Sequence, residues 1–131
     1  MKQILFLTLL LLLSVSCKKR PKNGDLDGFW QLQQLVEFAP SATEANDTLY
    51  PKKQYLSFQL DLMSLQSPQG TRLGRFDHAG DSLFINMLEG DLPFMKQYGA
   101  STLSPRYKVV RLNSDRMVLR SGESELSFRK W

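Results

Sequence analysis

Few side chains in this 131-residue chain are of the types that carry out catalysis. The chain has one cysteine, Cys17, and one histidine, His78, which follows Asp77 and lies close to Asp81. A nucleophilic site needs a base such as histidine held against a serine or cysteine. A zinc site needs about four ligands, three of them from the protein in catalytic centres. One histidine at the end of a predicted hairpin, with scattered aspartates around it, fits neither arrangement.

The other candidates for chemistry are two close pairs of carboxylates, Asp77 with Asp81 and Glu123 with Glu125. Paired carboxylates are the groups that hydrolyse glycosides. Both pairs lie in or next to predicted turns, where carboxylates are usually only solvated. The chain also lacks a glycine-rich phosphate-binding motif. We therefore predict a protein that is not an enzyme and that has no metal and no other cofactor.

The N-terminus has the features of a secretory signal peptide, predicted over residues 1–16. Lys2 precedes an apolar run from Ile4 to Leu13. A helix of about ten residues is roughly 15 Å long, half of the ~30 Å that a bilayer core requires. The following Ser14-Val15-Ser16-Cys17 resembles the lipobox of bacterial lipoproteins, although Ser14 stands where leucine is usual. This resemblance implies a lipid on Cys17; ordinary cleavage near Ser16, leaving a free or intermolecularly paired thiol, is the alternative.

The basic character of the chain comes from its first 22 residues. The whole chain has 17 Lys and Arg against 13 Asp and Glu, a net charge of +4. Five of the basic residues precede residue 23, which leaves 12 positive and 13 negative charges after it. A nucleic-acid-binding domain should carry its own basic face, so we predict no nucleic-acid partner. Residues 17–26 are predicted to be a tether, and residues 27–131 a single domain.

Residues 27–131 are divided by glycine, proline and polar pairs into short runs that alternate between apolar and polar. Strands are predicted over 29–38, 54–65, 71–78, 82–87, 106–112, 116–120 and 123–130. Residues 39–49 are predicted to form a loop, and residues 92–98, with Pro93 near their start, one or two helical turns. The pattern predicts an all-β, small antiparallel up-and-down barrel of seven or eight strands with one short helix, since closure removes exposed sheet edges.

The order of several short motifs resembles the small lipocalin-like lipoproteins of Bacteroidetes. These motifs are the lipobox, Asp27-Gly28-Phe29-Trp30, Tyr55-Leu-Ser-Phe-Gln59, Asp81-Ser82-Leu83, Gln97-Tyr98-Gly99 and the closing segments 117–120 and 126–129. The resemblance implies a lipocalin-like barrel with Gly28 and Trp30 at its closed end. It also implies that Arg129 or Lys130 stacks on Trp30, a cation–π contact.

The same resemblance implies a small hydrophobic or amphipathic ligand inside the barrel. Its lining would include Leu32, Phe58, Leu60 and Leu83. Gln34 lies on the Trp30 face and is a further candidate lining residue, whose inward amide requires a partner. Arg75 or Arg111 would hold an anion if it points inward. Outward, solvated arginines are the alternative for both. Phe94 and Met95 would lid the barrel or cover its end.

A short barrel can also be filled by its own side chains. The alternative function is therefore a protein-interaction module, an inhibitor or accessory subunit with a solid core. In both cases the membrane is a partner through the lipid anchor. Surface-exported lipoproteins of Bacteroidetes tend to have acidic residues after the cysteine, whereas Lys18-Lys19-Arg20 is basic. The resemblance thus implies attachment to the outer membrane, facing the periplasm.

Overall fold

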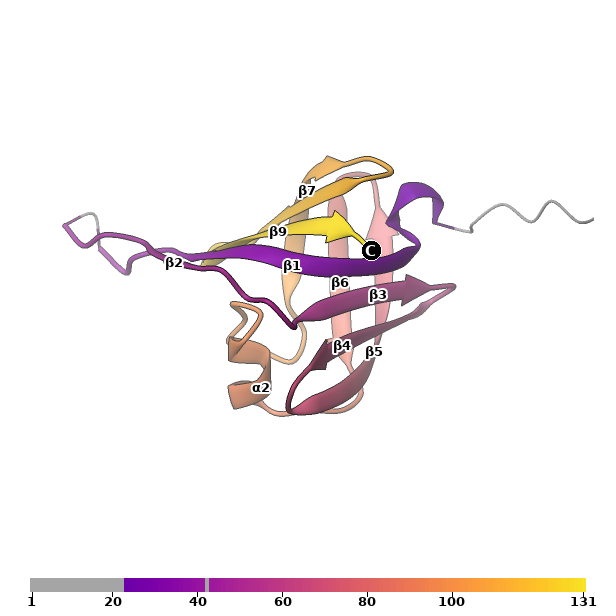
Figure 1. The fold of residues 1–131 in the computed structure, drawn as a ribbon, viewed down its shortest axis with the longest axis horizontal. Coiled ribbons are helices and arrows are strands. Elements are labelled where there is room, and N and C mark those ends of the chain that lie inside the picture. The colour runs from indigo at the N-terminus through magenta and orange to yellow at the C-terminus, as the bar shows by residue number, and fades with distance from the viewer. Residues whose placement is uncertain (1–22, 42) are drawn as a thin grey trace, which may run out of the picture.

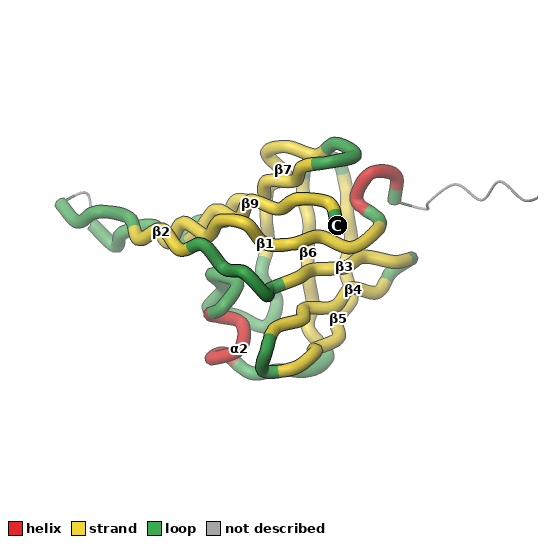
Figure 2. Tube along the Cα trace, in the orientation of Figure 1, coloured by secondary structure: helices red, strands yellow, loops and turns green. Residues whose placement is uncertain are grey.

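The computed structural model describes residues 23–41 and 43–131, and the main element of this part is one antiparallel β-sheet (Figures 1 and 2). The strands are β1 (Gly28–Glu37), β2 (Asp47–Leu49), β3 (Tyr55–Gln59), β4 (Leu62–Ser67), β5 (Gly70–Ala79), β6 (Ser82–Met87), β7 (Arg106–Leu112), β8 (Arg116–Arg120) and β9 (Ser124–Lys130). The helices are η1 (Gly24–Leu26), a 3-10 turn, and α2 (Leu92–Lys96). The predicted signal peptide, Cys17 and the basic run lie outside the described residues.

The sheet closes on itself because β1 pairs with both β3 and β9. The strands follow one another in chain order from β3 to β9, and β2 is added at the end of the sheet beside β1. This arrangement is an eight-stranded up-and-down barrel with one extra strand, which confirms the predicted fold. The extra strand lies within the predicted loop over 39–49, and all three of its residues are exposed.

The folded part begins before residue 27, where the tether was expected to end. Leu26 is fully buried, and its carbonyl accepts a hydrogen bond from the Trp30 indole nitrogen at 2.9 Å. Asn23 also donates a side-chain hydrogen bond to the Leu60 carbonyl at 2.8 Å. The short η1 turn is therefore part of the barrel and covers its closed end.

The predicted strand over 54–65 is wrong, because this segment forms a hairpin of β3 and β4. The chain reverses at Leu60-Asp61, and Leu60 has a φ of 58°, in the left-handed region. A reversal changes which residues face inward, since strand side chains alternate. Leu56 and Phe58 are buried, but beyond the turn Met63 replaces Leu62 on the inner side.

A β-bulge interrupts β1 and moves Gln34 off the core face. The register with β9 shifts between Leu32 and Gln34, so Gln33 is an extra residue. Trp30 and Leu32 face the core before the bulge, and Leu35 faces it afterwards. The predicted alternation through Gln34 is therefore wrong, and no inward amide has to find a partner.

The helix α2 covers the end of the barrel away from η1 (Figure 1). Its N-cap is Asp91, whose carboxylate accepts from the Phe94 amide at 2.9 Å. Phe94 and Met95 are buried, which confirms a short helix whose apolar residues close this end. The Tyr98 hydroxyl donates to the Gln66 carbonyl at 2.6 Å and fixes the segment against β4. Burial raises the pKa of the Tyr98 hydroxyl.

Candidate functional site

The closed end of the barrel is built on Trp30, whose side chain is fully buried. The Lys130 ammonium lies 4.4 Å from the centre of the Trp30 ring. The same ammonium donates to the Asp25 carbonyl at 3.0 Å and to the Asp27 carbonyl. Burial lowers the pKa of Lys130, while the charges of Asp25 and Asp27 oppose that shift. Gly28 has a φ of +125°, which L side chains rarely adopt, and an added Cβ would lie 2.8 Å from Lys130 Cε.

Arg129 does not contribute to this end of the barrel. It is exposed on β9, where it pairs in register with Gln31 of β1 and Arg116 of β8. The basic side chain expected above Trp30 is therefore Lys130 alone. Lys130 joins the last strand to the entry segment through backbone carbonyls, so its contacts are those of a structural residue.

The interior of the barrel is filled by its own side chains. Leu32, Phe58 and Leu83 are at most 2% exposed and belong to one continuous core. A small cavity among the core side chains, lined by Leu56, Tyr107 and Leu126 among others, holds only about 10 Å³. That is the space of about one water molecule. The prediction that Leu32, Phe58 and Leu83 line a ligand cavity is wrong: they are core residues.

The other predicted lining residues lie outside the barrel. Leu60 is 58% exposed at the tip of the β3–β4 hairpin. Arg75 is exposed on β5, where the inward positions are Gly74 and Phe76. Arg111 is exposed on β7, beyond a register shift between Val109 and Arg111. The prediction of an inward arginine that binds an anion is therefore wrong, and the alternative of solvated arginines holds.

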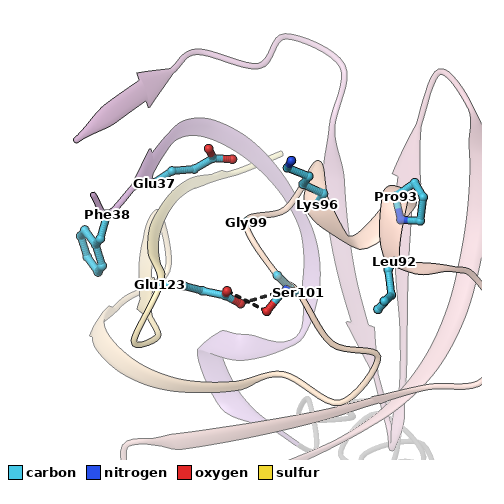
Figure 3. Close-up of a pocket in the computed structure, with 9 residues that line it drawn as sticks. Glu37, Phe38, Leu92, Pro93, Lys96, Gly99, Ser101 and Glu123 are labelled. Atoms are coloured by element: carbon cyan, nitrogen blue, oxygen red, sulfur yellow. Dashed lines mark hydrogen bonds between the residues drawn. The ribbon is translucent and has the colours of Figure 1, made fainter. Parts of the chain in front are cut away.

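An open cleft of about 690 Å³ lies beside α2 (Figure 3). The end of β1 contributes Glu37 and the following Phe38, and α2 contributes Leu92, Pro93 and Lys96. The remaining lining residues are Gly99, Ala100, Ser101 and Glu123. The cleft therefore has apolar side chains on both sides and three charged groups.

Hydrogen bonds hold the back of this cleft in place. The Glu123 carboxylate accepts from the Ser101 amide at 2.9 Å and from the Ser101 hydroxyl at 2.8 Å (Figure 3). The Ser124 hydroxyl donates to the Gly99 carbonyl at 2.8 Å. The segment after α2 is thus tied to the turn between β8 and β9. Glu37 and Lys96 form no ion pair within the described part of the chain.

The carboxylates of Glu123 and Glu125 have separate surroundings. Glu125 forms an ion pair with Arg120, whose Nε lies 2.7 Å from the carboxylate, whereas Glu123 binds Ser101. His78 is half-buried on β5. Among residues 23–41 and 43–131, no three His, Cys, Asp or Glu side chains come together as a metal site. In the same residues no helix has the length and apolar character needed to cross a bilayer.

Sequence reasoning missed most of the cleft. In the sequence, Glu123 is a candidate only as one of a carboxylate pair, and nothing distinguishes Glu37, Phe38, Leu92 or Lys96. The one local indication of the cleft is the irregular segment 92–98, in which Leu92 and Pro93 precede aromatic residues. Nothing in the sequence shows that this segment meets the end of β1.

Comparisons with known proteins agree with the fold. A family model described as a lipocalin-like domain matches residues 10–131. A lipocalin-like protein from Bacteroides uniformis is similar in structure, with a TM-score of 0.65 and 23% identity over 82% of this chain and 100% of that chain. An uncharacterized protein from Bacteroides eggerthii has a TM-score of 0.65 and 16% identity, over 81% of this chain and 99% of that chain. No curated protein matches significantly.

Proposed function

Because the chain belongs to the lipocalin-like domain family, we propose that it is a non-catalytic binding protein that takes a small amphipathic molecule in the cleft beside α2. The observation that carries this proposal is the contrast between two volumes. The cavity among the core side chains holds about 10 Å³, whereas the cleft offers about 690 Å³. Ligand pockets in proteins typically occupy about 300–1,000 Å³. The filled barrel then acts as a rigid support for a site at its end.

The lining of the cleft indicates what kind of molecule fits it. Phe38, Leu92 and Ala100 provide apolar contacts. Glu37 and Lys96 provide one charge of each sign, and Glu123 already accepts two hydrogen bonds from Ser101. A ligand with an apolar body and a zwitterionic head group would satisfy both sets of contacts. Such a pocket, with mostly apolar walls and a few polar groups, is typical of small-molecule sites.

One observation favours a second function, binding to another protein. The strand β2 ends the sheet and all three of its residues are exposed, so one edge of its backbone is open. An extended peptide can add to such an edge by backbone hydrogen bonds. The solid core suits this function equally well. Crosslinking in intact cells, followed by purification, would recover a stoichiometric partner if this second function applies.

The proposed cellular setting is the periplasmic face of the outer membrane, with the protein held by a lipid on Cys17. The support for the anchor is the sequence before residue 23, where a short apolar run ends in small residues and a cysteine. We expect an alkyne fatty acid to label the native protein in cells and not the Cys17→Ser variant. Equal labelling of the two proteins would contradict the anchor, and so would absence of labelling in both.

The cleft is tested by native mass spectrometry of the full-length protein, extracted from membranes of its host in mild detergent. We expect a retained non-protein mass in the wild type and its loss in Leu92→Asp, which puts a carboxylate on an apolar wall. Leu88→Asp is the matched control, since Leu88 is 56% exposed, Leu92 is 52% exposed, and only Leu92 lines the cleft. Retention in all three proteins, or in none, would contradict the proposed site.

A further inference from the structure

An aromatic cluster lies on the outside of the barrel, near the point where the described chain begins. The rings of Phe29 and Tyr55 are 5.2 Å apart, and those of Tyr55 and Trp131 are 5.6 Å apart in an edge-on arrangement. The Trp131 amide donates to the Phe29 carbonyl at 2.8 Å, which holds the last residue against β1. Trp131 nevertheless remains 73% exposed. Tryptophan and tyrosine in this setting are typical of membrane–water interfaces.

The two strands next to this cluster, β3 and β4, have no charged side chain at their outward positions. The outward residues of β3 and β4 are Tyr55, Ser57, Gln59, Leu62, Ser64 and Gln66. Leu60 and Leu62 are exposed at the far end of the hairpin. We call Phe29, Tyr55, Leu60, Leu62 and Trp131 together the tether-side surface. It is continuous across β1, β3 and β4, because Phe29 pairs with Ser57 and Gln59 pairs with Leu62. Two exposed charges of opposite sign border it at the hairpin tip: Asp61, between Leu60 and Leu62, and Arg75 of β5, in register with Leu62.

The chain enters the barrel at this surface. The Asn23 side chain donates to the Leu60 carbonyl at 2.8 Å. Cys17 precedes Asn23 by six residues, a span of at most roughly 20 Å when extended. A lipid on Cys17 would therefore hold the bilayer close to Leu60. The helix α2 lies at the opposite end of the barrel from η1 (Figure 1). The cleft is lined by residues of this helix.

Basic side chains border the tether-side surface on β8 and β9. In register across the strands, Arg116 pairs with Arg129, Arg129 with Gln31, and Gln31 with Tyr55. Both arginines are exposed. Asp115 offsets part of this charge, since its carboxylate lies 3.6 Å from Arg116. Arginines beside an aromatic surface complement anionic head groups. Each arginine near the membrane surface contributes about 1 kcal/mol to the free energy of binding.

We propose that the tether-side surface rests on the head-group region of an anionic bilayer, with the Trp131 ring at the interface and the α2 cleft facing away. This inference depends on the lipid anchor proposed above, which supplies the proximity. It does not depend on a ligand in the cleft. The barrel is thereby held in one orientation instead of moving freely at the end of its tether.

The test uses the full-length lipidated protein reconstituted in vesicles of phosphatidylcholine and phosphatidylglycerol, with bromine on the acyl chains as a fluorescence quencher. The chain has two tryptophans, and Trp30 is fully buried, so contact quenching reports on Trp131. We expect brominated lipid to quench the wild type and Trp131→Phe to lose most of that quenching. Vesicles of phosphatidylcholine alone should quench the wild type less.

The matched control moves the exposed tryptophan to another face of the barrel. The double variant Trp131→Phe with Phe84→Trp uses Phe84, which is 39% exposed on the outside of β6. We expect no lipid quenching of this variant. Quenching equal to that of the wild type would overturn the proposed orientation, and so would an unquenched wild type that floats with the vesicles. A wild type that fails to float would instead contradict the anchor, and the cleft is tested separately by mass spectrometry.

Discussion

Replacing Trp30 with alanine is expected to reduce the free energy of unfolding by about 3–5 kcal/mol, as is typical when a large buried aromatic is truncated. Trp30 is among the largest of the fully buried side chains. The change also removes the indole donor to the Leu26 carbonyl and the ring beneath the Lys130 ammonium. Since η1 and the end of β9 meet at this ring, the closed end of the barrel loses its central contact.

Urea unfolding followed by circular dichroism measures this loss without relying on tryptophan emission. Trp30→Phe should be intermediate, because it keeps a ring but loses the hydrogen bond, a contribution of about 1 kcal/mol. Trp131→Phe is the control, since changes at exposed positions usually alter stability by about 0.5 kcal/mol or less. If Trp30→Ala were as stable as Trp131→Phe, the buried ring would not be the support of this end of the barrel.

The strands that could be predicted from the sequence are those whose alternation is unbroken. Leu83, Ile85 and Met87 alternate with polar or exposed residues, and β6 spans the predicted residues 82–87. The bounds of β7 and β8 were also predicted, because Asn113 and Gly122 mark the turns at their ends. Period-two alternation is a local property, so a single sequence is enough to reveal it.

The errors arose where the alternation changes phase without a glycine or proline to mark it. The turn at Leu60-Asp61 puts an apolar residue in the left-handed region, which non-glycine residues rarely adopt. The extra residue in β1 is Gln33, which lies next to Gln34 and two residues after Gln31. Its residue type therefore does not mark it as a bulge. The turn leaves Leu60 exposed at the tip of the hairpin. The bulge turns Gln34 away from the core face.

The cleft could not be predicted, because its volume depends on segments far apart in the chain. Glu37, Leu92 and Glu123 meet only after the barrel has closed and the segment after α2 has joined the β8–β9 turn. The free volume inside the barrel could not be predicted for the same reason. The family resemblance implied a ligand inside, but Trp30, Phe58 and Met95 fill that space in a barrel this short.

The second large effect is expected for Gly99→Ala, at the back of the cleft. Gly99 has a φ of +70°, which disfavours an L side chain. An added Cβ would lie 2.6 Å from Ser124 Oγ and 2.7 Å from Leu35 Cδ1. Left-handed strain and overpacking together should reduce the free energy of unfolding by about 2–4 kcal/mol.

Gly80→Ala separates these two causes, because Gly80 has a φ of +60° and nothing within 4 Å of an added Cβ. It should lose only the conformational part, about 1–2 kcal/mol. Gly99→Ala should in addition displace the hydrogen bond from the Ser124 hydroxyl to the Gly99 carbonyl, and with it the ligand retained in mass spectrometry. Equal losses of stability in the two variants would mean that the segment around Gly99 moves to make room for the added Cβ with no loss of unfolding free energy. In that case the cleft wall would not be held by the contact between Gly99 and Ser124.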